Sequence, residues 1–164
     1  MAPASIDEAT TDSSGPALAL SNATRKALII SARYPGRLVL AADTVVCLGR
    51  TFFGKPRDLN EALEMLRSLC GKVHEVTTGV CLMRDNLQLS FHETSRVKFR
   101  PESEVNLPAY LERIQPLDKA GGYAAQDDQG ELIETIEGCR DNVAGLPLRR
   151  LMQALRKFPE KSAT

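Results

Sequence analysis

The sequence predicts a mixed α/β fold with an antiparallel hairpin in the middle of the chain. Segments with apolar residues at helical spacing alternate with apolar runs that are typical of strands. Residues 73–84 and the segment that ends near Phe99 both have strand character, and only the turn residues Asp85 and Asn86 separate them. At 164 residues the chain has the size of one domain, so we expect a single domain over residues 1–164.

The first predicted element is a helix over residues 17–33. Residues 1–16, which precede it, are rich in Ala, Ser, Thr, Asp and Pro and are predicted to be irregular. Apolar side chains recur in the helix at close to helical spacing, and Pro35 with Gly36 ends it. Lys26 lies on the flank of the apolar stripe, where a lysine normally keeps its ammonium group in water. The predicted stripe consists of Leu20, Ala23, Ala27 and Ile30.

A charged residue interrupts the most apolar segment of the chain. Residues 38–46 read as a strand that is buried on both faces, except that Asp43 lies within it. Burying an unpaired carboxylate is costly, so a purely structural strand would rarely carry one. The tight turn Gly54-Lys55-Pro56 follows and adds a cation. The pattern fits a phosphate-and-metal site or an aspartate that only caps the next turn, and by itself it favours neither.

Residues 57–70 have the clearest helical pattern of the chain. Asp58 and Glu61 resemble a capping box at the start, and Gly71 supplies the stop. The predicted buried stripe of this helix consists of Leu59, Ala62, Leu66, Leu69 and Cys70.

The second half of the chain predicts two further helices and a last strand. Residues 101–115 read as a helix whose regular part begins late because of Pro108. Residues 131–137 read as the last strand, and Pro147 opens the last helix. Before that strand, Gly121 and Gly122 follow a charged pair and would let the backbone approach a ligand closely. The predicted buried face of the last helix consists of Leu148, Leu151, Met152 and Leu155.

Composition argues against several classes of partner. Lys plus Arg and Asp plus Glu both number 21, and a chain without basic excess is an unusual binder of nucleic-acid polymers. No apolar run reaches transmembrane length, and residues 1–16 contain no Lys or Arg to open a signal peptide, so we expect no membrane contact and a cytoplasmic protein.

The cysteines and histidines do not have the spacing of metal ligands. The four cysteines form no C-x-x-C pair, which favours reduced thiols in a reducing compartment over a zinc site or a disulfide framework. His74 and His92 each lie in a predicted strand with no second histidine at ligand spacing, so we interpret them as packing or hydrogen-bonding residues. The cysteines are Cys47, Cys70, Cys81 and Cys139.

Five segments of the chain, in this order, resemble the Maf family of nucleoside triphosphate pyrophosphatases (septum-formation-type proteins). The resemblance extends from about Ile6 to the last helix, and the ordered set is far more specific than any one member. The segments are Ala42–Val46, Gly54–Pro56, Gly71–Val76 with Thr78–Val80, Pro116–Gly121, and Asn142–Val143 with Gly145–Pro147.

The resemblance implies a fold, a reaction and a cofactor. The implied fold is a mixed twisted sheet with flanking helices, related to inosine triphosphate pyrophosphatase-like folds. The implied reaction cleaves a nucleoside triphosphate between its α and β phosphates to a monophosphate and pyrophosphate. It requires a divalent metal cation, Mg²⁺ or Mn²⁺, and the protein is expected to be a homodimer.

The resemblance also assigns roles to individual residues. It implies that Asp43 is catalytic, as a metal ligand, as the general base for water, or as both. Glu8 of the Ile6-Asp7-Glu8 segment is the implied second metal neighbour. The implied substrate-binding residues are Lys26, Thr44, Lys55 and Gln126, of which Lys55 and Gln126 are typical of the branch that acts on dTTP and UTP.

The chain departs from the family pattern at its start. Family members open with a strand and an S-x-S-P-R-R loop whose arginines hold the triphosphate, and nothing before Ile6 resembles this segment. The chain is then truncated, starts upstream of Met1, or has lost the segment, and we expect an open sheet edge and a tendency to associate. The alternative to an active enzyme is a catalytically impaired nucleotide-binding or regulatory protein that acts in the control of cell division.

Overall fold

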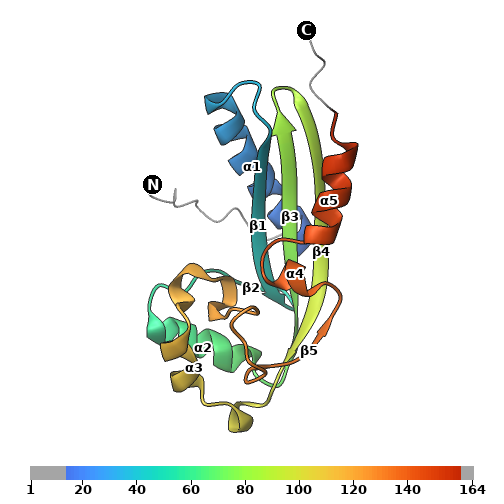
Figure 1. Cartoon of the computed structure of the whole chain (residues 1–164). Coiled ribbons are helices and arrows are strands. Elements are labelled where there is room, and N and C mark those ends of the chain that lie inside the picture. The colour runs from blue at the N-terminus through green and yellow to red at the C-terminus, as the bar shows by residue number, and fades with distance from the viewer. Residues whose placement is uncertain (1–13, 160–164) are drawn as a thin grey trace.

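The computed structural model describes residues 14–159 and contains one five-stranded sheet (Figure 1). The strand order is β2-β1-β3-β4-β5, and each of the four pairings is antiparallel. Helices cover parts of both faces, which confirms the predicted α/β class. The strands are β1 (Val39–Leu48), β2 (Thr51–Phe53), β3 (Val73–Arg84), β4 (Leu87–Phe99) and β5 (Ile133–Glu137).

The predicted hairpin is the centre of the sheet. β3 and β4 pair without interruption from Val73 opposite Lys98 to Arg84 opposite Leu87. Asp85 makes the turn with a φ of 52°, a left-handed conformation that aspartate tolerates better than most residues. The β3–β4 hairpin runs almost the full length of the molecule and therefore contacts both halves of it.

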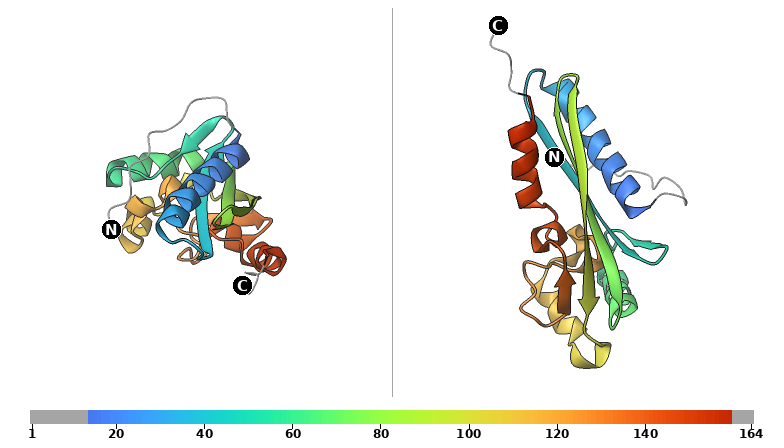
Figure 2. Two further views of the ribbon diagram at one scale, coloured as in Figure 1. Left: turned by 90° about the horizontal axis from the view of Figure 1, so that it is seen from above. Right: turned by 90° about the vertical axis from the view of Figure 1, so that its right-hand side faces the viewer.

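Helix α1 (Gly15–Arg33) and helix α5 (Leu148–Lys157) cover opposite faces of one half of the sheet (Figure 2). The bounds of both helices are close to those predicted, but the buried face of α1 agrees with the prediction only at Ala23 and Ala27. Leu20 is only half-buried and Ile30 is exposed, whereas the residues that face the sheet are small. They are Ala19, Ala23, Ala27 and Ser31.

A glycine in the sheet explains this small-residue face. α1 crosses β3 at Gly79 so closely that a Cβ atom there would lie 2.4 Å from the backbone carbonyl of Ala19. A large side chain such as that of Leu20 cannot enter so narrow a gap, so it turns to the helix flank.

Helix α2 (Leu59–Leu69) and helix α3 (Leu107–Arg113) pack together against the other half of the sheet. Asp58 caps α2 by accepting from the Glu61 N–H at 2.8 Å, as predicted. The predicted stripe of α2 is right except for Leu59, which is 55% exposed because it begins the helix outside the core. The core here includes Leu66, Leu69, Val76, Val97, Phe99, Tyr110 and Leu132.

Two further burial predictions are wrong. β1 is not buried on both faces: Leu40 is 45% exposed, because α5 covers the sheet mainly over β3 and β4. On α5, Leu148 and Met152 are each more than half exposed, and Leu151 with Ala154 makes the contact to the sheet. In each case the apolar pattern marks an element correctly but not which of its faces is covered.

The remaining elements are short. They are the 3₁₀ segments Glu102–Glu104, Pro116–Asp118 and Ala120–Gly122, and the one-turn helix α4 (Arg140–Val143). All four cysteines are free, and no helix among residues 14–159 combines the length and apolar character that crossing a bilayer requires.

Candidate active site

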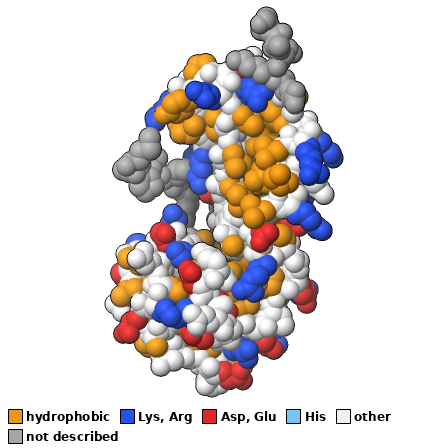
Figure 3. Space-filling model, viewed as in Figure 1, with side chains coloured by type: hydrophobic (Ala, Val, Ile, Leu, Met, Phe, Trp, Pro, Cys, Tyr) orange, Lys and Arg blue, Asp and Glu red, His pale blue; other side chains and the backbone are white. Residues whose placement is uncertain are grey.

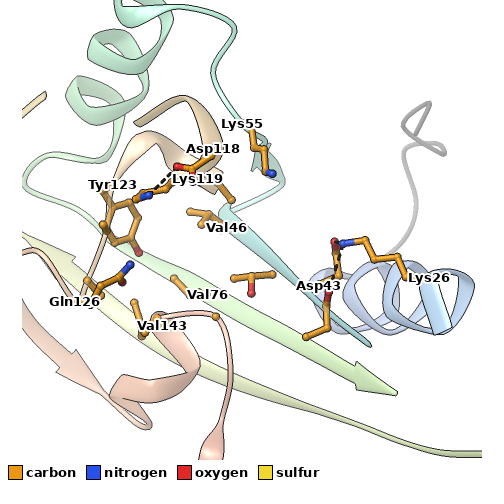
Figure 4. A pocket seen from close by; sticks show the side chains of 17 residues that line it. Lys26, Asp43, Val46, Lys55, Val76, Asp118, Lys119, Tyr123, Gln126 and Val143 are labelled. Carbon is orange, nitrogen blue, oxygen red and sulfur yellow. Dashed lines mark hydrogen bonds and ion pairs between the residues drawn. The ribbon is translucent and has the colours of Figure 1, made fainter. Parts of the chain in front are cut away.

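A pocket of about 280 Å³ opens where the two halves of the molecule meet. It is formed by α1, β1, the turn after β2, Val76 of β3, the 3₁₀ segments after α3 with the residues that follow them, and the end of α4 with the loop after it (Figure 4). The structure therefore brings together residues from six parts of the chain. Five of the predicted site residues line it: Lys26, Asp43, Thr44, Lys55 and Gln126.

At one end of the pocket, α1 presents two donors to Asp43. Lys26 Nζ lies 2.6 Å from Asp43 Oδ1 and 3.3 Å from the carbonyl oxygen of Ala42. Asn22 Nδ2 donates to the other carboxylate oxygen, Oδ2, at 3.0 Å. The Asp43 side chain is only 17% exposed, and this pairing compensates its desolvation. Asn22 was missed from the sequence, although it precedes Lys26 by one helical turn on the same flank.

Lys55 lies across the pocket from Asp43, beside an aspartate–lysine pair (Figure 4). The Lys55 turn is tied to the 3₁₀ segment by the Gly121 N–H, which donates to the Gly54 carbonyl oxygen at 2.9 Å. Lys119 Nζ donates to Asp118 Oδ1 at 2.7 Å. This hydrogen bond lowers the pKa of the Asp118 carboxyl, and the charge of Lys55 acts in the same direction.

Tyr123 and Gln126 form a third side of the pocket. The Tyr123 ring is buried, and its hydroxyl lies 3.0 Å from Nε2 of the buried His74. Gln126 is exposed and extends into the pocket next to Tyr123 (Figure 4). An amide held beside a buried aromatic wall can hydrogen-bond a flat polar ring, which is what a base-reading residue must do.

Asn142 holds the fourth side of the pocket in place. It is fully buried, and its amide nitrogen donates to the Val76 carbonyl oxygen and to Ser95 Oγ, each at 2.9 Å. Its Oδ1 accepts from the Thr78 N–H at 3.2 Å. The Thr78 hydroxyl in turn lies 2.9 Å from that of Thr44. These bonds fix α4, and with it the loop that follows, to β3 and β4. Apart from the Asn142–Val143 match, nothing in the sequence indicated this role.

Comparison with known proteins decides the family. The Maf family, described as Maf-like protein, matches residues 1–158. The chain belongs to the Maf family. The predicted resemblance is confirmed.

Three curated relatives of this Maf chain are named dTTP/UTP pyrophosphatase. The relative from Symbiobacterium thermophilum is 43% identical over 154 residues, which is 93% of this chain and 79% of the relative. The relative from Myxococcus xanthus is 44% identical over 135 residues, 82% of this chain and 68% of its own length. The relative from Bacillus velezensis is 39% identical over 140 residues, which is 85% of this chain and 74% of the relative.

The Maf pocket has the charges of a site for a small anion. Three lysines and two aspartates line it, and the lysines lie at both ends. Cations separated in this way can contact an extended polyanion at more than one phosphate. Thr44 adds a half-buried hydroxyl to the pocket lining.

A divalent metal fits the donors of this pocket. Mg²⁺ is usually bound by one or two carboxylates together with substrate phosphates and water, and Asp43 offers such a carboxylate. Within residues 14–159 no group of three or more His, Cys, Asp or Glu side chains could hold a metal without the substrate. Glu8, the predicted second metal neighbour, lies outside the described residues, so its role stays a prediction.

Proposed function

We propose that this Maf chain is a nucleoside triphosphate pyrophosphatase that hydrolyses dTTP and UTP to the monophosphate and pyrophosphate. The observation that carries the proposal is the single pocket that holds Asp43, Lys26, Lys55 and Gln126 together. The relatives named dTTP/UTP pyrophosphatase support it, since they match most of the chain at about 40% identity. The substrate, the metal and the roles of the individual residues are parts of this same proposal.

The reaction needs charge neutralisation and an oriented water more than covalent catalysis. Water attacks the α-phosphorus, the bond from that phosphorus to the bridging oxygen breaks, and pyrophosphate leaves with the bridging oxygen. Asp43 would accept the proton of the water, while Lys26 and Lys55 hold phosphate oxygens. Lys26 can do so because its side chain is 42% exposed even while it is paired with Asp43.

We propose Mg²⁺ or Mn²⁺ as cofactor, held by Asp43 with Glu8 as second carboxylate. The metal would supply positive charge to the phosphates when bound. We expect dialysis against EDTA to abolish pyrophosphate release and added Mg²⁺ or Mn²⁺ to restore it. A thermal shift caused by Mn²⁺ with a non-hydrolysable nucleotide, and lost in Asp43→Asn, gives a readout independent of turnover. Full activity in excess chelator would contradict the metal requirement.

Base selection is assigned to Gln126, with Lys55 as second donor. Uracil and thymine offer an O4 acceptor next to an N3–H donor, and one glutamine amide can pair with both. Cytosine reverses this order and leaves a polar group unpaired, a mismatch that can outweigh a lost methyl contact worth about 1 kcal/mol. We therefore expect comparable rates for dTTP and UTP and a much lower rate for CTP.

The Gln126→Ala variant tests this assignment. We expect it to reduce the ratio of the UTP rate to the CTP rate by about tenfold, because the discriminating amide is gone. Gln129→Ala is the matched control, since Gln129 is exposed and does not line the pocket. A purine triphosphate as best substrate, or an unchanged ratio in Gln126→Ala, would contradict the assignment. Nucleotide binding without pyrophosphate release would favour the binding-protein alternative.

We also propose that the protein is cytoplasmic, does not bind nucleic-acid polymers and forms a homodimer. Among the described residues, Val39–Val45 of β1 pair on one side only, because β2 pairs only with Val46–Leu48. Apolar side chains also gather over α5 and the adjoining sheet, among them the exposed Met152 (Figure 3). An open strand edge beside an apolar surface favours association, which sedimentation velocity measures.

A further inference from the structure

Both oxygens of the Asp43 carboxylate receive a hydrogen bond from α1. Lys26 Nζ is 2.6 Å from Oδ1, and Asn22 Nδ2 is 3.0 Å from Oδ2. The two donors are four residues apart, so they lie one above the other on the helix flank that faces β1. A carboxylate with one partner can still rotate about its Cβ–Cγ bond, and a second partner on the other oxygen fixes its plane.

The orientation of the Asn22 amide follows from its neighbours. Only its nitrogen can donate to a carboxylate, so its Oδ1 points away from Asp43. That oxygen accepts from Arg25 Nη2 at 3.4 Å, a longer contact than the one to Asp43. Arg25, Asn22 and Asp43 therefore form a chain of hydrogen bonds that begins at the solvent-exposed side of α1.

Asn22 acts from behind the carboxylate and not from inside the pocket. Lys26 and Asp43 line the pocket, whereas Asn22 is not among its lining residues. Nor does Asn22 hold the helix to the sheet, since Ala19, Ala23 and Ala27 make that buried contact. Within residues 14–159 the amide nitrogen of Asn22 donates to the Asp43 carboxylate, and the amide oxygen accepts from Arg25.

We propose that Asn22 is a positioning residue that sets the plane of the Asp43 carboxylate, with Arg25 orienting the Asn22 amide. The proposal rests on the proposed function, in which Asp43 acts on the attacking water. Loss of the amide leaves the charge, the pocket and Lys26 in place but frees the carboxylate to rotate. Such a defect lowers kcat more than it raises KM, because the substrate contacts are unchanged.

The experiment compares the unsubstituted chain with Asn22→Leu, Asn22→Gln and the control Ser21→Leu. Leu is close to Asn in size but cannot donate a hydrogen bond, whereas Gln keeps the amide. Ser21 is exposed on the same helix, and the hydrogen bonds to the Asp43 carboxylate come from Asn22 and Lys26 instead. We expect Asn22→Leu to lower kcat for dTTP about tenfold with KM changed less than twofold. Asn22→Gln should recover part of the loss, and Ser21→Leu should behave like the unsubstituted chain.

Arg25 supplies a second test through a double-mutant cycle. We expect Arg25→Ala to lower kcat about threefold alone and to have no further effect in the Asn22→Leu background, since its influence passes through the amide. If the effects of Arg25→Ala and Asn22→Leu on kcat were additive, Arg25 would not act through the Asn22 amide. An unchanged kcat in Asn22→Leu, or an equal loss in Ser21→Leu, would overturn the positioning role.

A measurement that does not depend on enzymatic turnover separates the positioning role of Asn22 from the proposed pyrophosphatase function. In a ¹H–¹⁵N NMR spectrum, we expect the side-chain amide resonances of Asn22 to shift in Asp43→Asn and in Arg25→Ala. If these shifts occur but the unsubstituted chain releases no pyrophosphate, the proposed function fails while the hydrogen-bond chain stands. If the chain turns over dTTP and the resonances do not respond to Asp43→Asn, the positioning role fails alone.

Discussion

At the scale of single residues, Asp43 is tolerated on an otherwise apolar strand because a neighbouring helix supplies its partners. Its side chain is 17% exposed, and α1 gives each carboxylate oxygen a donor within 3.0 Å. A structural aspartate would need no open approach from solvent, yet Asp43 also lines the pocket. A paired carboxylate that faces a cavity is the arrangement expected of a group that handles a ligand.

We therefore expect Asp43→Asn to lower kcat at least a hundredfold while the fold survives. The substitution keeps the shape but removes the proton acceptor and the anionic metal ligand. Lys26 loses its partner but remains 42% exposed and thus hydrated, so the melting temperature should change by only a few degrees. Steady-state kinetics measures the loss in kcat, and thermal unfolding followed by circular dichroism measures the melting temperature. A folded variant with the parent rate would show that Asp43 is not catalytic.

Sequence reasoning found five of the residues that line the pocket but not those that hold them in place. Asp43, Thr44 and Lys55 stand in short segments whose order indicated a family. Lys26 and Gln126 were assigned through the same resemblance, and the structure brings all five to one pocket. Asn22 lies in none of these segments. Asn142 stands in the last of them, but an asparagine on a helix or in a loop is usually an ordinary surface or turn residue, so neither was assigned a role. Only the fold shows that their amides meet Asp43, Val76 O and Ser95 Oγ.

At the scale of elements, periodicity located the helices well and found the buried face of α2, but it misjudged parts of the buried faces of α1 and α5. For α1 the apolar stripe predicted that Leu20 and Ile30 face the core, whereas alanines and Ser31 do. The cause lies in another element: Gly79 of β3 creates a contact that only small side chains fit. A single sequence does not show which strand a helix crosses, so it cannot reveal this constraint.

This contact predicts the effect of adding one methyl group to β3. In Gly79→Ala the new Cβ would lie 2.4 Å from backbone atoms of Ala19, so α1 must move. We expect a loss of stability of about 1–3 kcal/mol or more, as for other overpacked cores. Because α1 also carries Lys26, activity should fall in the fraction that remains folded. Urea unfolding and dTTP turnover measure the two effects.

Gly15→Ala is the control for that prediction. It adds the same methyl group on α1, but the nearest atoms, Thr77 Oγ1 and Val45 Cγ2, lie at an ordinary contact distance of 3.7 Å. We expect its stability and activity to stay close to those of the parent chain. Equal stability of Gly79→Ala and Gly15→Ala would show that α1 does not dock as described.

At the scale of the whole molecule, the sheet joins two packed halves, and His74 lies inside one of them beside Tyr123, which lines the pocket. It is 1% exposed and makes edge contacts with Phe99 and Tyr123, at ring-centroid distances of 4.7 and 5.6 Å. Its Nε2 lies beside the Tyr123 hydroxyl, while Nδ1 has no partner among the described residues. A proton on this ring would thus be buried without a counter-charge.

Burial lowers the pKa of His74 from 6.5 to about 4, which makes the folded state sensitive to acid. Below pH 6.5 the unfolded chain binds a proton at His74 that the folded chain does not accept until about pH 4. The contribution of His74 to the free energy of unfolding is therefore fully present above pH 6.5. It falls by about 3 kcal/mol as the pH falls to 4.

Urea unfolding at pH 7, 5.5 and 4 measures this decline. In His74→Gln, which can still bond the Tyr123 hydroxyl but does not titrate, we expect a smaller decline over the same range. If His74→Gln loses as much stability between pH 7 and 4 as the parent chain does, the acid sensitivity originates elsewhere.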